Sequence, residues 1–153
     1  MEEISTIGVR TAFRRAPHMS YGGAVVWFTS PPGFVFQLVE PVRGTLDLVN
    51  WMVGPVYEEL DRRFPGRTAL IMVLDLELMT GRSAASRTVF LAKAREVGKR
   101  FSEGLFVPPR AASPANRVAT HASIALIRAL GVHIELASSS VSAVASRNLV
   151  PAL

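Results

Sequence analysis

Hydrophobic positions near the start of the chain follow the two-residue period of β-strands. Residues 24–30 (AVVWFTS) and 34–40 (FVFQLVE) are rich in β-branched and aromatic side chains, and the sequence PPG separates them. Pro32 followed by Gly33 suits the centre of a type II turn, because proline fixes φ at about −65° and glycine accepts a positive φ. The pattern therefore predicts a β-hairpin, and residues 4–13 predict a weaker strand before it.

The next segment repeats its hydrophobic positions with the period of a helix. Thr45 can cap this helix, because a threonine hydroxyl accepts a hydrogen bond from a backbone N–H of the first turn. Gly54 and Pro55 interrupt the pattern, since proline removes a backbone donor and cannot continue a regular α-helix without a kink. The helix is predicted over 45–64, with a buried face made of Val49, Val53, Val56, Leu60 and Phe64.

A nearly continuous run of hydrophobic residues follows at 68–78 (TALIMVLDLEL). A strand that is covered on both faces has this composition, as in a sheet with helices packed on it. We therefore expect residues 70–74 to form a central strand. Asp75 and Glu77 differ by two positions, so on a strand their side chains would point to the same face, and we expect both to be solvated at the edge of the sheet.

The rest of the chain alternates between helices and strands. Ser113 is a natural N-cap, Pro114 suits the first helical position, and Gly131 can end the helix between them. The pattern predicts helices over 83–101, 113–131 and 139–147 and strands over 104–109 and 132–138.

This order of elements predicts an α/β fold. Strands that alternate with helices imply parallel strands joined by crossover helices, and the leading hairpin makes the sheet mixed. We expect a mostly parallel sheet with an N-terminal β-hairpin. At 153 residues the chain is most simply one domain, with a core at about residues 24–147.

The helix predicted over 83–101 is basic. Arg87, Arg95 and Lys99 are expected on its exposed side, where they would form a positive ridge that attracts an acidic protein surface. The buried stripe of the helix would then consist of Phe90, Ala94, Val97 and Phe101.

Composition and charge narrow the range of functions. The chain has no cysteine, which excludes disulfides, thiol chemistry and thiolate metal sites. Its net charge is +5, but the basic residues are scattered, which argues against nucleic-acid binding. The histidines show no metal-ligand spacing and no phosphate-binding loop is present, so we expect no metal, cofactor or catalytic residue.

The hydrophobic segments indicate a protein outside the membrane. The longest of them are about as long as a strand, whereas a membrane-spanning helix needs ~20 residues. The N-terminus, MEEISTIGVR, is acidic and lacks the hydrophobic segment of a signal peptide. We therefore expect no transmembrane segment and a cytoplasmic location.

The order of the predicted elements resembles that of a known family. The order of hairpin, helix, ALIMVLDLELMTGRSAASR, basic helix, strand, helix, VHIEL and terminal helix is similar to that of a STAS domain. STAS domains include the anti-sigma-factor antagonists, and their relatives are grouped with SEC14-like lipid-binding domains. The likeness covers about residues 24–147, and its most specific part is VLDLELMTG followed by a helix. It implies a STAS-like fold and a non-enzymatic bacterial module for protein–protein interaction or regulation.

The resemblance can be followed at the helix start. Antagonists of this family carry a serine or threonine there, which a partner kinase phosphorylates. If Asp75 matches the acidic residue that ends the family's strand, Ala84 stands where the hydroxyl is expected and Ser86 where a glycine is expected. A shift of one residue in this match would place Ser83 at the position of the expected hydroxyl. The motif is not intact, and the residues themselves favour Ser83 as a helix N-cap over a phosphorylation site.

Two classes of binding function remain. In the first, another protein, with an acidic surface, docks on the loop 79–83 and the following helix, and a homodimer is a further option. The alternative is a small-molecule or lipid-binding domain, with an apolar pocket of several hundred Å³ between the hairpin and the first helix. The candidate partner-binding residues are Thr80, Gly81, Arg82, Ser83, Arg87, Arg95 and Lys99.

Aromatic residues crowd the predicted hairpin. Alternation places Phe34 and Phe36 on one face, while Trp27 and Phe28 point to opposite faces. Core packing explains most of them, and we expect at least one large aromatic side chain to stay uncovered and mark a dimer or partner surface.

Overall fold

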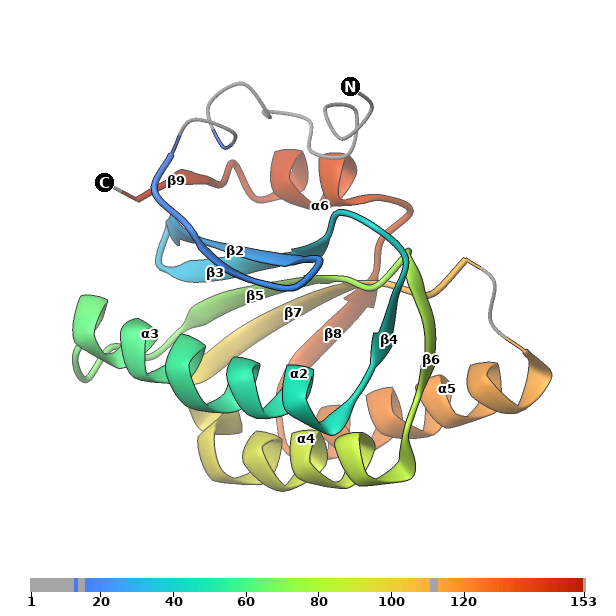
Figure 1. Cartoon of the computed structure of the whole chain (residues 1–153). Helices are drawn as coiled ribbons and strands as arrows, with labels where there is room; N and C mark the ends of the chain where they lie inside the picture. Colours follow the sequence, from blue (N-terminus) through green and yellow to red (C-terminus); the bar gives the residue numbers. More distant parts are fainter. Residues whose placement is uncertain (1–12, 14–15, 111–112, 153) are drawn as a thin grey trace.

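The fold is a sheet with helices on both faces (Figure 1). The computed structural model describes residues 13, 16–110 and 113–152. Within them, one seven-stranded sheet has the order β1-β2-β3-β5-β7-β8, and β9 pairs with β2. Its strands are β1 (Met19–Tyr21), β2 (Ala24–Ser30), β3 (Gly33–Leu38), β5 (Leu70–Asp75), β7 (Phe101–Val107), β8 (His133–Leu136) and β9 (Val150–Pro151).

The pairing confirms the predicted sheet. β2 and β3 form the antiparallel hairpin, and the pairs β3–β5, β5–β7 and β7–β8 are parallel. β5 lies between β3 and β7, and all its side chains are buried except that of Ile71, which is half-buried. The hydrophobic run therefore forms a central strand, because only there do both of its faces find cover. Gly33 begins β3, where a Cβ atom would overlap the carbonyl oxygen of Ile71.

The helices cover the two faces of the sheet unequally. In Figure 1, α2, α3, α4 and α5 lie on one face and α6 lies on the other. Each of α2, α4, α5 and α6 is capped by a threonine or serine whose hydroxyl accepts a backbone N–H three residues later. Their bounds are α2 (Leu46–Trp51), α3 (Tyr57–Arg63), α4 (Ala84–Val97), α5 (Pro114–Ala129) and α6 (Ser140–Ser146).

The predicted interruption of the first helix is a π-helical turn. The turn η2 (Met52–Val56) contains Pro55 and joins α2 to α3. Proline donates no backbone hydrogen bond, so the regular i to i−4 pattern cannot pass through it. Thr45 caps α2 as expected, because its Oγ1 accepts the N–H of Leu48 at 3.2 Å.

A second, two-stranded sheet was not predicted. β4 (Val42–Gly44) pairs in parallel with β6 (Met79–Arg82), and Gly44 lies opposite Arg82. Residues 79–82 were expected to be a loop. The two strands approach closely at Gly44, where a Cβ atom would lie 3.0 Å from both Arg82 Cγ and Met79 Cε.

The basic helix is shorter than predicted. α4 ends at Val97, and a 3₁₀ turn, η3 (Gly98–Arg100), leads into β7. Phe101 therefore belongs to the sheet and not to the helical stripe. It packs edge to face on Phe34, with ring centroids 6.0 Å apart, so burial in the core outweighs its helical spacing. The predicted strand at 4–13 lies, except for Phe13, outside the described residues.

The hairpin aromatics all belong to the core. Trp27 packs on the α6 side of the sheet, and the other three pack on the opposite side, as the alternation predicts. None is more than 6% exposed, so the expectation of an uncovered aromatic in the hairpin is wrong: Trp27, Phe28, Phe34 and Phe36.

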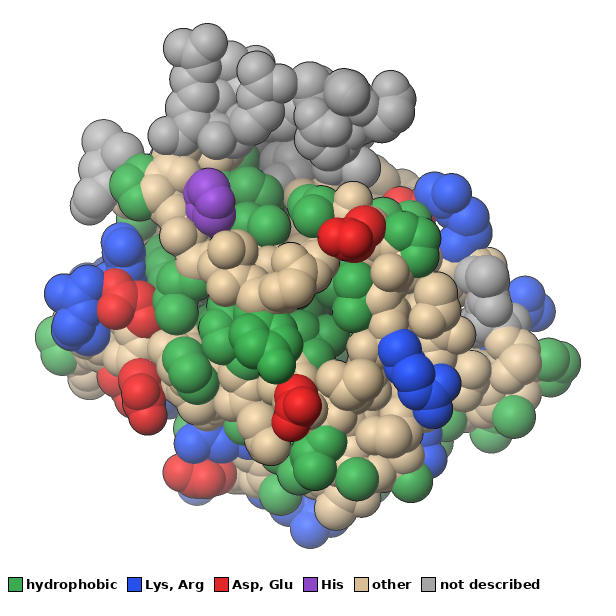
Figure 2. Space-filling view, in the orientation of Figure 1, with side chains coloured by type: hydrophobic (Ala, Val, Ile, Leu, Met, Phe, Trp, Pro, Cys, Tyr) green, Lys and Arg blue, Asp and Glu red, His purple; other side chains and the backbone are tan. Residues whose placement is uncertain are grey.

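The exposed aromatic pair lies elsewhere. Tyr21 of β1 stacks on Trp51 of α2 with centroids 5.6 Å apart, and Tyr21 is 42% exposed. Figure 2 shows hydrophobic side chains gathered in the middle of the face on which β1, α2 and β4 lie. Within the described part of the chain, no helix is both long enough and apolar enough to span a membrane.

Candidate functional site

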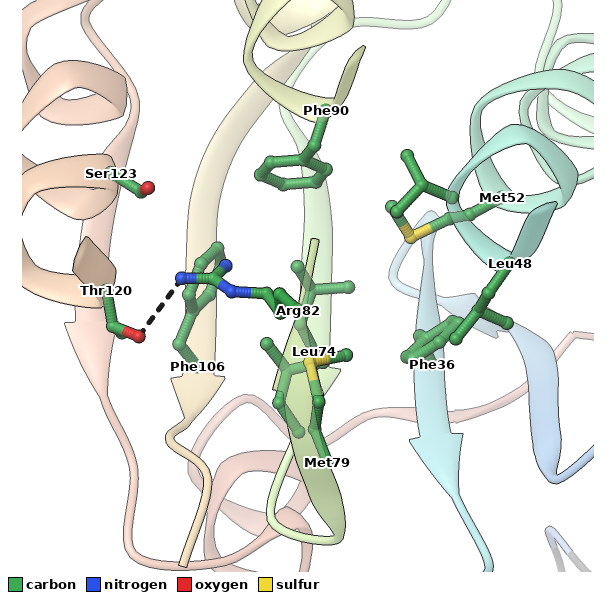
Figure 3. A pocket seen from close by; sticks show the side chains of 12 residues that line it. Phe36, Leu48, Met52, Leu74, Met79, Arg82, Phe90, Phe106, Thr120 and Ser123 are labelled. Carbon is green, nitrogen blue, oxygen red and sulfur yellow. Dashed lines mark hydrogen bonds between the residues drawn. The ribbon is translucent and has the colours of Figure 1, made fainter. Parts of the chain in front are cut away.

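An apolar pocket lies between the sheet and the helices α2, α4 and α5. Its volume is about 60 Å³. Hydrophobic side chains form most of its wall, and Figure 3 shows them arriving from the sheet, from α2 and from α4. These hydrophobic side chains include Phe36, Leu48, Met52, Leu74, Phe90 and Phe106.

Arg82 is the charged residue of this pocket. It ends β6, and the pairing of β6 with β4 turns its side chain inward, where it is half-buried. Its Nη2 donates a hydrogen bond to Thr120 Oγ1 at 3.2 Å, the dashed line of Figure 3. Among the described residues it has no carboxylate partner. Burial, with a smaller contribution from nearby Arg87, lowers the pKa of the Arg82 guanidinium.

Two hydroxyl groups of α5 lie on the same side of the pocket as the Arg82 guanidinium. Thr120 and Ser123 are three positions apart and so are neighbours on one face of the helix. Ser123 is only 6% exposed, and within the described residues its hydroxyl makes no hydrogen bond. Figure 3 shows its oxygen directed toward the pocket. The few polar groups of the pocket therefore lie at its α5 side, and the rest of its wall is apolar.

A second hollow lies on the other side of Thr120. Its volume is about 170 Å³, and Thr120 lines both it and the apolar pocket. Arg117, His121 and Leu136 contribute to its wall. The side chain of Thr120 thus separates the inner, apolar space from an outer space that carries basic groups.

The start of α4 is held by β4. Ser83 is the N-cap, and its Oγ accepts the N–H of Ser86 at 3.0 Å, which confirms the predicted cap. The Ser83 N–H and the buried Ser86 hydroxyl both donate to the carbonyl oxygen of Gly44, at 3.2 and 3.0 Å. Ser86 therefore joins α4 to β4. Ala84, which follows the cap residue Ser83, is exposed.

The candidate partner-binding residues extend from β6 along α4 to η3. Thr80, Gly81 and Arg82 line one shallow depression beside α5. Arg95 lies 12 residues after Ser83, which is about 18 Å along a helix. Arg95 and Lys99 are exposed as predicted, but Arg87 is half-buried, and Lys99 lies in η3, beyond the end of α4. The predicted ridge is therefore interrupted.

Asp75 is buried, contrary to expectation. It is 4% exposed at the end of β5, and its Oδ1 accepts the N–H of Glu77 at 3.0 Å. Burial raises the pKa of the Asp75 carboxyl, and the hydrogen bond from Glu77 opposes this effect. Glu77 lies beyond the strand and pairs with Arg110, so the two carboxylates do not share a face of a strand.

The described residues contain no group of three histidine, aspartate or glutamate side chains that could hold a metal ion. The pocket residues that sequence reasoning missed are Thr120, Ser123 and Phe106. The sequence showed only that these residues belong to a predicted helix or strand. It could not show that they meet at a pocket, because the contacts between β6, β7 and α5 depend on crossovers in the chain.

Comparisons with known proteins bear on the fold. The sequence matches no family model and no curated protein. The structure is similar to that of an uncharacterized protein of the DUF3478 family from Shewanella loihica PV-4, whose crystal structure is described as having a SpoIIAA-like fold. The likeness has a TM-score of 0.50 at 11% sequence identity and covers 81% of this chain and 85% of that chain. The chain has a SpoIIAA-like fold. The STAS-like fold expected from the sequence is thereby confirmed.

The Ser83 cap leads to a stability prediction. Replacing Ser83 with alanine should lower the free energy of unfolding by about 0.5–2 kcal/mol, because the Ser86 N–H loses its acceptor. Ser83→Asp should melt near the wild type, since aspartate also caps well. Thermal melting of the two variants measures this. If Ser83 is a phosphorylation switch instead, Ser83→Asp will abolish binding of a partner while the melting temperature stays unchanged.

The buried Asp75 leads to a pH prediction. Its raised folded-state pKa means that the folded protein keeps a proton at pH values where the unfolded chain has lost it. The stability associated with that proton is complete below the ordinary value of 3.8 and is lost as pH rises through the raised pKa. Asp75→Asn carries no charge at any pH and keeps a carbonyl acceptor for the Glu77 N–H.

The melting temperature of Asp75→Asn minus that of the wild type should therefore increase between about pH 4 and pH 7. Taking the difference cancels the other titrating groups. A difference that stays constant across this interval would show that burial does not perturb this carboxyl.

Proposed function

We propose that this chain is a non-catalytic binding domain whose pocket between the sheet and α2, α4 and α5 takes a small apolar molecule. The observation that carries the proposal is the composition of the wall. Side chains such as Phe36, Met52, Phe90 and Phe106 enclose a space that is apolar nearly throughout. Water in such a space gains few hydrogen bonds, so an apolar ligand replaces it favourably.

The size of the pocket restricts the ligand. A cavity of this kind holds one water-sized group for about every 10–15 Å³, so the 60 Å³ present here suit about four to six such groups. Pockets for drug-sized ligands are several times larger. The pocket lies beneath α2, but at about 60 Å³ it is much smaller than the several hundred Å³ that the alternative interpretation of the sequence expected, and this size favours a small molecule over a lipid.

The non-catalytic character of the proposal has separate support. Catalysis by a serine nucleophile requires a base within hydrogen-bond reach of the hydroxyl. At the pocket, Ser123 makes no hydrogen bond within the described residues, and the hydroxyl of Thr120 is hydrogen-bonded to Arg82 and not to a base. A binding role needs only the shape and the apolar wall that are present.

A matched pair of substitutions tests the pocket. Val49 lines it from α2, whereas Val53, four residues later and also half-buried, does not. Val49→Phe should weaken binding of a small apolar probe such as benzene by at least about tenfold, because the larger side chain occupies the space, and Val53→Phe should leave the affinity unchanged. NMR titration measures affinity, and melting curves check folding. Absence of benzene binding to the wild type, or equal effects of the two variants, would overturn the proposal.

A second function, docking of a protein partner in a regulatory role, has its own observation. The structure pairs Arg62, Arg63, Lys93, Arg100, Arg110 and Arg147 with carboxylates. Arg95 and Lys99 are exposed and have no such partner within the described residues. Unpaired charges of one sign steer a partner of the opposite sign, here an acidic protein surface in the bacterial cytoplasm.

The exposed charges of Arg95 in α4 and Lys99 in η3 allow a test that spares the fold. Arg95→Glu with Lys99→Glu should weaken a partner recovered from the native cell, and the loss should shrink at high salt because salt screens charges over about 8–10 Å. Arg67→Glu with Arg117→Glu changes the net charge equally on other surfaces and serves as the control. Excess non-specific DNA should not displace the partner. Equal affinities of the two double variants would remove α4 from the interface.

A further inference from the structure

We infer that the ligand of the apolar pocket is a small anionic amphiphile, with one carboxylate held by Arg82 and Ser123 and an apolar body directed toward α2. The inference rests on the proposed function and names the chemical class of the ligand. Four observations lead to it: an unpaired cation, a free hydroxyl, the polarity of the pocket and its size.

The first observation is the unpaired charge of Arg82. Partial removal of a guanidinium from water is unfavourable unless an anion or hydrogen-bond acceptors replace the lost water. Lys93 and Arg147, which are also half-buried, have such partners: Lys93 pairs with Glu96, and Arg147 pairs with Glu103 and Glu135. Half-buried Arg87 has none within the described residues, but it does not line the pocket. Within residues 16–110 and 113–152, Arg82 has only the hydroxyl of Thr120 as a side-chain partner, through one of its nitrogens. Its remaining N–H groups are free to bind an acceptor among the groups of a ligand.

A carboxylate fits this donor set. The planar fork of a guanidinium matches the two oxygens of a carboxylate, and charge-assisted hydrogen bonds of this kind are stronger than neutral ones. Ser123 is 6% exposed, and its hydroxyl, which makes no hydrogen bond in the described part of the chain, supplies a further donor beside Thr120. The structure thus gathers a cation and two hydroxyls at a single end of an apolar space.

The arrangement in Figure 3 sets the orientation of the ligand. The guanidinium of Arg82 extends toward Thr120 of α5, while Leu48 of α2 and Met52 of η2 lie across the pocket with Phe36. A carboxylate at the α5 end therefore leaves the apolar body of the ligand among these hydrophobic side chains. The reverse orientation would bury the carboxylate without a donor.

The size of the pocket limits the body to about four to six heavy atoms. Short straight-chain carboxylates and benzoate fall in this range, and long-chain fatty acids do not. The outer hollow, which shares Thr120 with the pocket, is lined by Arg117 and His121.

Titration of three matched probes tests the inference. Sodium hexanoate, hexanol and hexylamine share the same six-carbon chain and differ in the charge of the head group. The wild type should bind hexanoate about tenfold to a hundredfold more tightly than hexanol, as expected for charge-assisted hydrogen bonds, and hexylamine most weakly. Calorimetry or NMR titration at neutral pH gives the affinities.

Variants at Arg82 distinguish the head-group contact from the pocket itself. Arg82→Met keeps a long side chain but removes the charge, so it should lower the affinity for hexanoate at least about tenfold and leave that for hexanol unchanged. Arg82→Lys keeps the charge without the fork and should give an intermediate affinity. Ser123→Ala should reduce hexanoate binding severalfold. Because Arg82→Met also removes a half-buried charge, its melting temperature should equal or exceed that of the wild type.

The outcomes separate the two proposals. If hexanol binds as tightly as hexanoate, or Arg82→Met leaves hexanoate affinity unchanged, the anionic ligand is excluded and the apolar pocket stands. If neither hexanoate, hexanol nor benzoate binds the wild type, both the inference and the proposed function fail. Selective loss of hexanoate binding in Arg82→Met supports both.

Discussion

The carbonyl oxygen of Gly44 accepts the hydrogen bonds on which the arrangement of α2 and α4 around the pocket depends. It accepts hydrogen bonds from the backbone of Ser83 and the buried hydroxyl of Ser86, so it ties the start of α4 to the end of β4. Gly44 also lies directly before Thr45, the cap of α2, and pairs opposite Arg82. Two helices therefore begin side by side, and in each case a single cap residue separates the helix from the end of a paired strand.

This shared starting point creates the pocket and sets its polarity. Because α2 and α4 are held together at their N-termini, they cover the sheet with α5 and leave a small apolar space beneath them. The same strand pairing turns Arg82 inward, to the α5 end of that space. α4 then serves two surfaces: Phe90 lines the pocket, and Arg95 lies exposed on the outside. A SpoIIAA-like fold does not itself imply either use, since function depends on the residues of the site.

Local signals in the sequence were enough for most of the framework. The hydrophobic run at 70–74 requires cover on both faces, and β5 is central. Thr45, Ser83 and Ser113 were identified as caps because a cap is a contact between residues three positions apart, which sequence alone can show. Pro55 likewise had to interrupt its helix, because the missing donor is a covalent property of the residue.

Some elements depend on contacts between residues that are distant in the sequence, so only the tertiary structure determined them. β4 and β6 are only three and four residues long and are strands because they pair with each other across 34 residues or more of sequence, so neither shows a period of its own. Phe101 follows the helical spacing but joins the sheet, where Phe34 buries it.

The candidate site shows the same division. The sequence placed Arg82 in a loop next to the start of a helix. Its side chain points into the pocket because β6 pairs with β4, where Arg82 lies opposite Gly44. Its contact with Thr120 joins residues 38 positions apart. Capping and periodicity act within a few residues and can be read along the chain, whereas the polarity of a pocket depends on which distant side chains the crossovers bring together.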